Sequence, residues 1–396
     1  MINVLILKFP HNSNSGGGEK HTLSLVKNLS AGNFNFYLAS SCHVLLEEFK
    51  TCTELSRSKR NYSFKKVWLG LEPVSIKGLI IFTATLPYTF WRLFFLLIYY
   101  KFKRKARRRA EKAYDILYCL NLTEKLLATL PAKLLGYKIF WMEHIRIERW
   151  LLQNPYRPLY VLLSNLVTTI TVSNSVKKQL VDLGLKENKV KVIYNGINTN
   201  NFKPQKILDT KYKIQNTIIG SVGRLNIEKG MDYLIKAFKN ILKKYPKAQL
   251  QIAGKGPEEK NLKKLARDLN IENSVKFLGY IDNEKIPEFY NNISIFALTP
   301  TRRESFGLVA AEAGACEKPS VVTNISGLAE VIENNKTGFV VEAKNINAIS
   351  EALIKLIANK ELREKFGKNA RVRVLENFTE EKMIEEFEKT FTEITV

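Results

Sequence analysis

Short apolar runs alternate with longer amphipathic stretches along most of the chain. In the N-terminal half the apolar runs predict strands at 2–7, 34–39, 115–120, 138–141 and 168–172. The C-terminal half repeats this order, with strands predicted at 217–223, 249–254, 275–278 and 293–298. Amphipathic stretches between the strands predict helices, an alternation that is typical of βαβ units with parallel pairing. The pattern therefore predicts an α/β protein with two parallel sheets.

The 396 residues are enough for two domains of ordinary size. The apolar runs give way to Asn, Lys and Pro204 near residues 198–215, so we place the boundary there. This predicts an N-terminal domain over 1–200 and a C-terminal domain over 201–378. A charged amphipathic stretch predicts a last helix within 379–396.

Composition narrows the class of protein. The chain is 45% hydrophobic and 25% charged, which is typical of a globular protein. Its four cysteines are scattered without metal-ligand spacing, so we expect a reduced cytoplasmic protein with no metal site. The first residues are too short an apolar run for a signal peptide and are predicted to form a strand.

The net charge of +24 is unevenly distributed. Residues 1–200 hold 30 Lys and Arg against 12 Asp and Glu, whereas residues 201–396 hold 32 against 26. The excess is therefore +18 in the first half and +6 in the second. An anionic partner for the N-terminal half is expected, and both a membrane surface and a nucleic acid have that sign.

Residues 79–112 join a long apolar run to a basic one. The run from Leu79 approaches the roughly 20 residues that span a membrane, but Pro87 and Arg92 interrupt it. We therefore predict a helix in the plane of an anionic membrane surface, and a buried helix with a solvated basic end is the alternative. The cations expected to face the membrane are Lys101, Lys103, Arg104, Lys105, Arg107, Arg108 and Arg109. Nucleic-acid binding is disfavoured because no recognised module accompanies the charge.

Two carboxylates stand eight residues apart around a predicted helix start. Glu304 follows the strand at 293–298, and Glu312 lies in the small, apolar stretch that begins at Leu308. Gly307 is at the turn, where a residue without Cβ is needed. A helix N-terminus offers free N–H groups to an anion. A ligand with hydroxyls at both ends and phosphates between them, such as a nucleotide sugar, fits this layout.

A second cluster follows the strand at 217–223. Gly223, Arg224 and Lys229 precede a predicted helix, where two cations can hold a diphosphate. Fixed cations there would stabilise the charge that develops as a glycosidic bond breaks. The alternative is a helix start with solvated surface charges.

The spacing of Glu304 and Glu312 resembles the glutamate–seven–glutamate motif of retaining GT-B glycosyltransferases, family 4 in particular. The sequence at 317–323, 327–332 and 336–341 also matches. Ser305 and Glu317 stand where the family usually has glycine, and neither change removes a carboxylate.

This resemblance implies two Rossmann-like, doubly wound domains that face across a cleft. It implies retaining transfer from a nucleotide sugar without a required metal or a tightly bound cofactor. Arg224 and Lys229 would stabilise the leaving diphosphate, Glu304 would contact the donor sugar and Glu312 the ribose. The further donor-binding residues implied are Gly223, Ser305, Phe306, Gly307 and Leu308.

In the N-terminal half the resemblance points to an acceptor site. Gly17 and Gly18 belong to a glycine loop that would close over the diphosphate and the acceptor, and Glu19 is a candidate acceptor contact. His144 follows the strand at 138–141 and would face the sugar, whereas a lone histidine is more often structural.

We therefore expect a cytoplasmic enzyme at the inner face of the membrane. It would transfer a sugar to a lipid-linked or membrane-associated glycan, in the assembly of a cell-surface polysaccharide. The alternatives are another GT-B enzyme, such as a sugar-nucleotide epimerase or a phosphorylase, and a non-catalytic protein that binds membrane surfaces.

Overall fold

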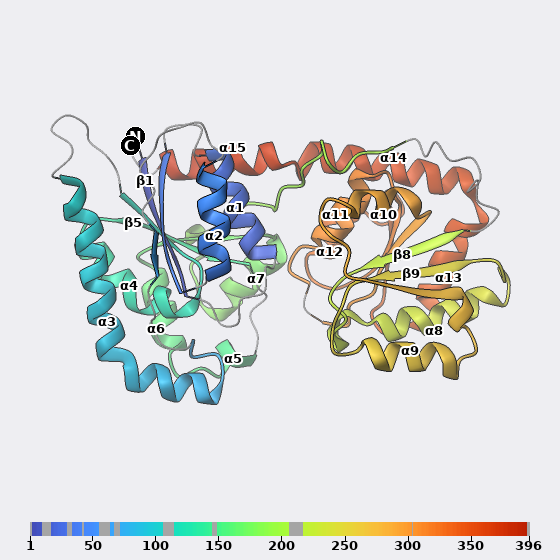
Figure 1. Cartoon of the computed structure of the whole chain (residues 1–396), viewed down its shortest axis with the longest axis horizontal. Coiled ribbons are helices and arrows are strands. Elements are labelled where there is room, and N and C mark those ends of the chain that lie inside the picture. The colour runs from blue at the N-terminus through green and yellow to red at the C-terminus, as the bar shows by residue number, and fades with distance from the viewer. Residues whose placement is uncertain are drawn as a thin grey trace. The chain divides into compact units, whose positions relative to one another are not determined.

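The protein folds as two units, each with its own parallel sheet (Figure 1). The computed structural model describes residues 2–9, 17–29, 34–41, 43–54, 64–66, 72–105, 115–144, 149–205, 217–302 and 304–393. The first unit contains Met1–Ile193 together with Ile384–Val396, and the second contains Tyr194–Met383.

The sheet of the first unit has seven strands, all paired in parallel. In spatial order they are β3 (Phe64–Lys66), β2 (Phe34–Ser40), β1 (Ile2–Lys8), β4 (Asp115–Cys119), β5 (Lys138–Glu143), β6 (Thr168–Thr171) and β7 (Val190–Val192). The order reverses between β1 and β4, so this sheet is doubly wound. Ligands of such sheets bind beyond the carboxyl ends of the strands at the reversal.

Helices connect these strands and cover both faces of the sheet. They are α1 (Gly17–Leu29), α2 (His43–Glu54), α3 (Ile76–Lys105), α4 (Leu122–Leu134), α5 (Arg149–Leu152), α6 (Arg157–Ser164) and α7 (Asn174–Leu183). One face packs against α3, α4, α6 and α7, with Leu117 and Trp141 in that core. On the opposite face, Tyr118 and Phe140 contact Phe391 of the last helix, α15 (Glu380–Glu393).

The second unit repeats the architecture with six parallel strands. Their order is β10 (Val275–Gly279), β9 (Gln249–Ala253), β8 (Ile218–Val222), β11 (Ile295–Leu298), β12 (Ser320–Thr323) and β13 (Gly338–Val341). The helices are α8 (Met231–Leu242), α9 (Glu259–Asp268), α10 (Ile286–Asn292), α11 (Leu308–Ala315), α12 (Leu328–Val331), α13 (Ile346–Ala358) and α14 (Lys360–Asn377). Here the strand order reverses between β8 and β11.

The predicted α/β class with two doubly wound sheets is confirmed. All nine predicted strands coincide with observed ones, and the C-terminal helix is present as α15. Pro87 does not end the apolar helix, because α3 continues through it from Ile76 to Lys105.

Candidate functional site

The loops that follow β8 and β11 meet at the reversal point of the second sheet. Thr301 donates its backbone N–H to the carbonyl of Glu228 at 2.9 Å, and the hydroxyl of Thr299 donates to the carbonyl of Gly230 at 3.0 Å. A Cβ on Gly230 would lie 2.1 Å from the Thr299 carbonyl oxygen, so this approach requires glycine. The two loops are therefore held as one surface at the carboxyl edge of the sheet.

This surface brings together two of the predicted site residues. The Lys229 ammonium contacts the Glu304 carboxylate, with 2.6 Å between Nζ and Oε2. The two side chains are 25% and 14% exposed, so solvent still reaches the pair. Arg224 is exposed in the same loop as Lys229, and its guanidinium forms no hydrogen bond or ion pair with any residue that the structure describes. A cluster of two cations and one carboxylate thus lies at this edge.

The segment 304–307 leads directly into α11. Gly307 has a φ of +98°, and a Cβ there would lie 2.5 Å from a methyl carbon of Leu328. The N–H of Gly327 donates to the Glu304 carbonyl at 3.1 Å, and a Cβ on Gly327 would lie 2.2 Å from the Ser305 carbonyl. Two glycines therefore fix the turn that aims the start of α11, whose N-terminus favours an anion. Gly307 was predicted at this turn, whereas Gly327 was noted only as part of the matching stretch 327–332.

Phe306 has a structural side chain. It is buried, and its ring packs against the rings of Tyr194 and Phe378. Only its backbone can therefore serve a ligand, which is the role that the resemblance implies. Ser305 and Leu308 are partly exposed on either side of it.

Glu312 lies inside α11, and a buried tyrosine fixes one oxygen of its carboxylate. The Tyr290 hydroxyl donates to Oε2 at 2.7 Å. Burial, and then the neighbouring carboxylate, raises the pKa of this phenol well above its usual value, so it remains a hydrogen-bond donor. Because the helix begins only at Leu308, Glu304 lies in the preceding loop, and the two glutamates do not share one helix face. Tyr290 was not identified from the sequence.

In the first unit, His144 directly follows β5 and lies against the start of α1. A Cβ on Gly18 would lie 3.3 Å from Cδ2 of His144, and the rings of His21 and His144 are 4.7 Å apart. The Nε2 atom of His144 is buried and has no hydrogen-bond partner among the residues that the structure describes. Burial, with smaller contributions from His21 and nearby lysines, holds the pKa of His144 well below its usual value. The ring is therefore neutral. Gly17 and Glu19 lie in the same helical turn as Gly18.

A buried polar network supports this edge of the first sheet. The Lys125 ammonium, 3% exposed, contacts the Glu143 carboxylate at 2.6 Å and donates to the Met142 carbonyl at 2.7 Å. The Tyr160 hydroxyl donates to the same Glu143 oxygen at 2.7 Å. The sequence pattern gave no sign of this network, since its members come from β5, α4 and α6.

Another carboxylate lies at the start of α4. Glu124 is fully buried, and its Oε1 accepts the backbone N–H of Asn121 at 2.6 Å. Burial and the nearby carboxylate of Glu72 raise its pKa to about 8. The side chain is therefore protonated at neutral pH.

The basic run begins at the end of α3, and the structure describes only its first part. Lys101 is held inside the first unit, where it contacts Asp115 at 2.8 Å and lies over the ring of Tyr137. Its side chain is still 23% exposed, so the predicted contact of Lys101 with a membrane stays a prediction. Lys103, Arg104 and Lys105 lie in the last turn of α3, and Arg107, Arg108 and Arg109 lie outside the described residues.

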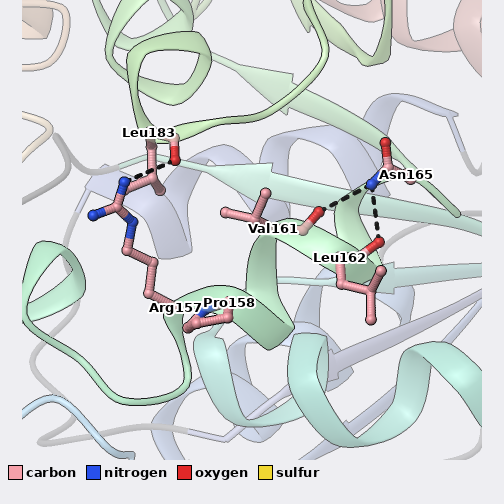
Figure 2. Close-up of a pocket in the computed structure, with 6 residues that line it drawn as sticks. All are labelled: Arg157, Pro158, Val161, Leu162, Asn165 and Leu183. Atoms are coloured by element: carbon pink, nitrogen blue, oxygen red, sulfur yellow. Dashed lines mark hydrogen bonds between the residues drawn. The ribbon is translucent and has the colours of Figure 1, made fainter.

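A hollow of about 550 Å³ lies elsewhere in the first unit (Figure 2). It is lined by Arg157, Pro158, Val161, Leu162, Asn165 and Leu183. Arg157 donates across it to the Leu183 carbonyl at 3.2 Å, and most of the remaining lining is apolar. None of the predicted site residues lines this hollow, so we do not assign it to the candidate site. Within the described ranges no cluster of three or more metal-ligating side chains occurs.

Comparisons with known proteins identify the families that each half of the chain resembles. The model of "Glycosyltransferase Family 4" matches residues 15–201, and that of "Glycosyl transferases group 1" matches residues 204–373. The chain is 34% identical over 243 residues to the capsular polysaccharide biosynthesis glycosyltransferase CapM of Staphylococcus aureus, covering 56% of this chain and 60% of CapM. It is 29% identical to N-acetyl-alpha-D-glucosaminyl L-malate synthase of Bacillus anthracis, over 58% and 60% of the two chains. The matched part is thus less than two thirds of the length of these curated relatives.

Solved structures match over almost the whole chain. A glycosyltransferase from Rickettsia africae ESF-5 has a TM-score of 0.79 at 21% identity, covering 99% of this chain and 98% of that one. Anabaena HepE in complex with UDP and glucose has a TM-score of 0.74 at 20% identity, covering 98% and 99%. At these identities the match concerns the fold.

Proposed function

Because this chain belongs to the GT-B glycosyltransferases, with a family 4 region followed by a group 1 region, we propose that it transfers a sugar from a nucleotide-diphosphate sugar to a glycan acceptor with retention of configuration. The observation that carries this proposal is the contact between Lys229 and Glu304 beside the start of α11. It joins a diphosphate-binding cation to a sugar-binding carboxylate at the reversal point of a doubly wound sheet.

The donor binds the second unit in this proposal. Lys229 and Arg224 hold the diphosphate, and the start of α11 adds its positive dipole end. Backbone groups of Gly223, of 305–307 and of Leu308 approach the phosphates and the sugar. A partly exposed ion pair contributes at most about 1 kcal/mol, so Lys229 can exchange the Glu304 carboxylate for a phosphate at little cost.

Binding of the diphosphate leaves Glu304 free to accept hydrogen bonds from hydroxyl groups of the donor sugar. Glu312, fixed by Tyr290, takes the ribose hydroxyls. As the glycosidic bond breaks, negative charge grows on the diphosphate, and the two cations and the helix N-terminus stabilise it where it develops. No tightly bound cofactor or metal is needed for this step.

The acceptor binds the first unit. A neutral His144 with a buried, unpartnered Nε2 supports a role in bonding a sugar hydroxyl, and Gly17, Gly18 and Glu19 lie in the adjacent turn. CapM is named for capsular polysaccharide biosynthesis, which supports a role in the assembly of a cell-surface polysaccharide. We therefore propose a lipid-linked or membrane-associated glycan as the acceptor.

The location proposed is the cytoplasmic side of the membrane. Each cation near an anionic leaflet contributes about 1 kcal/mol. The run from Lys103 to Arg109 holds six cations in the sequence, so it would attract the protein to such a surface at low salt.

Thermal shift with a panel of nucleotide sugars tests the donor site. UDP-sugars come first, because the HepE structure contains UDP and glucose. We expect one donor to raise the melting temperature of the wild type, and Lys229→Gln to remove that rise. Glu304→Gln should retain donor binding and abolish transfer and donor hydrolysis, whereas Glu272→Gln on the exposed surface serves as the matched control.

Turnover of Glu304→Gln at the wild-type rate would refute the role of this carboxylate. Conversion of the donor to free nucleotide and an epimerised sugar without any acceptor would favour the epimerase alternative.

A further inference from the structure

Exposed large apolar side chains of the first unit are confined to one group of helices. Among the described residues of that unit, all of them lie on α3, α4, α5 or α6. They are Ile76, Ile80, Tyr88, Trp91, Phe95, Tyr99, Phe102, Leu130, Leu134, Leu152, Leu159 and Leu162. None lies on α1, α2 or α7 among the side chains that the structure describes there, so the distribution is one-sided.

The helix α3 is apolar on two faces. Its inner face packs into the core of the unit through residues such as Leu93 and Leu97, which are fully buried. Its outer face exposes Tyr88, Trp91 and Phe95 at 52%, 54% and 62%. These three residues are spaced by three and four positions, so they form one stripe along the helix.

Exposed apolar side chains also occur on the neighbouring helices. The helix α3 packs beside α4, and α4 packs beside α6. Leu134 of α4 is 79% exposed and Leu162 of α6 is 66% exposed. Figure 1 shows these three helices together on one side of the first sheet. We call the outer surface that they form the apolar face.

Large exposed apolar patches on a protein surface commonly mark a contact with a membrane or another protein. We propose that the apolar face lies on an anionic lipid bilayer, with α3 in the plane of the interface. In this orientation Tyr88, Trp91 and Phe95 reach the boundary between the headgroups and the acyl chains. The proposal rests on the membrane location proposed above, and is independent of the donor chemistry.

Three observations favour a bilayer as the occupant. Tyr and Trp pair an apolar ring with a polar group, and both concentrate at membrane interfaces. The sequence after Phe102 continues into the basic run, and residues 1–200 carry an excess of +18, which suits anionic lipid. A second copy of this chain would instead bring two such positive halves together.

The helix α3 is long and apolar enough to span a membrane by length and composition alone. Its inner face argues against spanning, because Leu93, Leu97 and Tyr100 belong to the core cluster of the first unit. A spanning α3 would withdraw these side chains from that core. Lying in the interface keeps the inner face packed and buries the outer face in lipid.

The test uses the full chain and two kinds of vesicle. One is phosphatidylcholine alone, and the other contains equal parts of phosphatidylcholine and phosphatidylglycerol. The test variant is Trp91→Gln/Phe95→Gln, and the matched control is Leu278→Gln/Tyr280→Gln, which removes two exposed apolar residues of the second unit. Binding is measured by co-sedimentation at low and at high salt.

We expect the wild type and the control to bind the anionic vesicles and to retain part of that binding at high salt. The partition coefficient of the test variant should be about tenfold or more lower at both salt concentrations. Two aromatic rings that would move from water into lipid have been replaced by polar side chains. Binding by charge alone would vanish at high salt for the wild type, and the test variant would bind as well as the wild type at low salt. That pair of results would overturn the proposal. Absence of wild-type binding to either vesicle would also overturn it.

Tryptophan fluorescence gives a second measurement. Trp91→Phe keeps an apolar ring, so vesicle binding should persist while most of the lipid-induced blue shift disappears. A blue shift that survives unchanged would place Trp91 outside the lipid. Sedimentation without lipid tests whether a second copy of this chain covers the apolar face instead. A dimeric wild type with a monomeric test variant would assign the face to that second copy.

Thermal shift by the donor separates this proposal from the proposed function. The test variant should retain donor stabilisation, because its changes lie in the first unit. Lost vesicle binding with retained donor stabilisation supports the apolar face as a membrane contact. Unchanged vesicle binding in the test variant would overturn it, whether or not any donor binds.

Discussion

The buried carboxyl group of Glu124 makes the stability of the first unit depend on pH in a specific window. Burial and the neighbouring Glu72 raise its pKa from an ordinary 4.5 to about 8. Folded protein therefore keeps a proton that the unfolded chain releases above pH 4.5. The stabilisation is complete below that pH, falls as the pH rises towards 8, and is constant above it.

The interval between the two pKa values sets the magnitude. At about 1.4 kcal/mol for each pH unit, the interval from 4.5 to about 8 corresponds to a loss of about 5 kcal/mol in the free energy of unfolding. Glu124→Gln keeps the shape and the acceptor for the Asn121 N–H but cannot ionise. The new amide group would lie where Oε2 is buried without a partner, which costs about 1–3 kcal/mol at every pH.

The assay is thermal unfolding of the wild type and of Glu124→Gln from pH 5 to pH 8.5. The melting temperature of Glu124→Gln minus that of the wild type should increase as the pH rises, by about 10 °C across the window for a unit of this size. Taking the difference cancels other titrating groups such as His144, which is unchanged in the variant. Two melting profiles that run parallel over this range would refute the reasoning.

Two further changes test the two sites separately. Gly307→Ala should lower the melting temperature and weaken donor binding in thermal shift, because it strains a φ of +98° and brings a Cβ to 2.5 Å from Leu328. Wild-type donor binding in this variant would show that the turn is not part of the donor site. Lys125→Met should cost about 3 kcal/mol of unfolding free energy, because it leaves the Glu143 carboxylate without its cation. Part of that loss should return with Glu143→Gln added, and Lys133→Met on the same helix, where the lysine is exposed, should cost little.

Local periodicity was sufficient to predict the α/β class and nine of the strands, whereas the doubly wound topology was implied by the family resemblance. The short strands β3, β7, β12 and β13 were not predicted as strands, although the four-residue strands β6 and β11 were, so length alone does not explain the omission. The contact between Lys229 and Glu304 could be anticipated only through the family motif. Their proximity depends on β8 and β11 being neighbours, and that order is a property of the whole sheet.

Other features could not be derived from local pattern. The partners Tyr290 for Glu312 and Lys125 for Glu143 come from different elements, so no spacing in the sequence joins them. The helix α3 is apolar on both faces, and periodicity alone does not say which face meets solvent. Lys101 illustrates the same point, because only the folded unit shows that Asp115 holds it.

The two candidate sites are built by different physical means, and this difference predicts how each will fail. In the second unit, Gly230, Gly307 and Gly327 allow backbone segments to approach more closely than any Cβ would permit. This site should therefore be sensitive to a single added carbon.

In the first unit the corresponding edge depends on the ionisation of buried groups. Glu124 stabilises the fold in its protonated form, so its contribution declines above pH 4.5. His144 stabilises the fold in its neutral form, so its contribution is complete above its usual pKa of 6.5 and is lost as the pH falls below it. These opposed dependences should confine acceptor binding to a narrower pH range than donor binding. A pH range for donor binding that is as narrow as the pH range for acceptor binding would contradict this division.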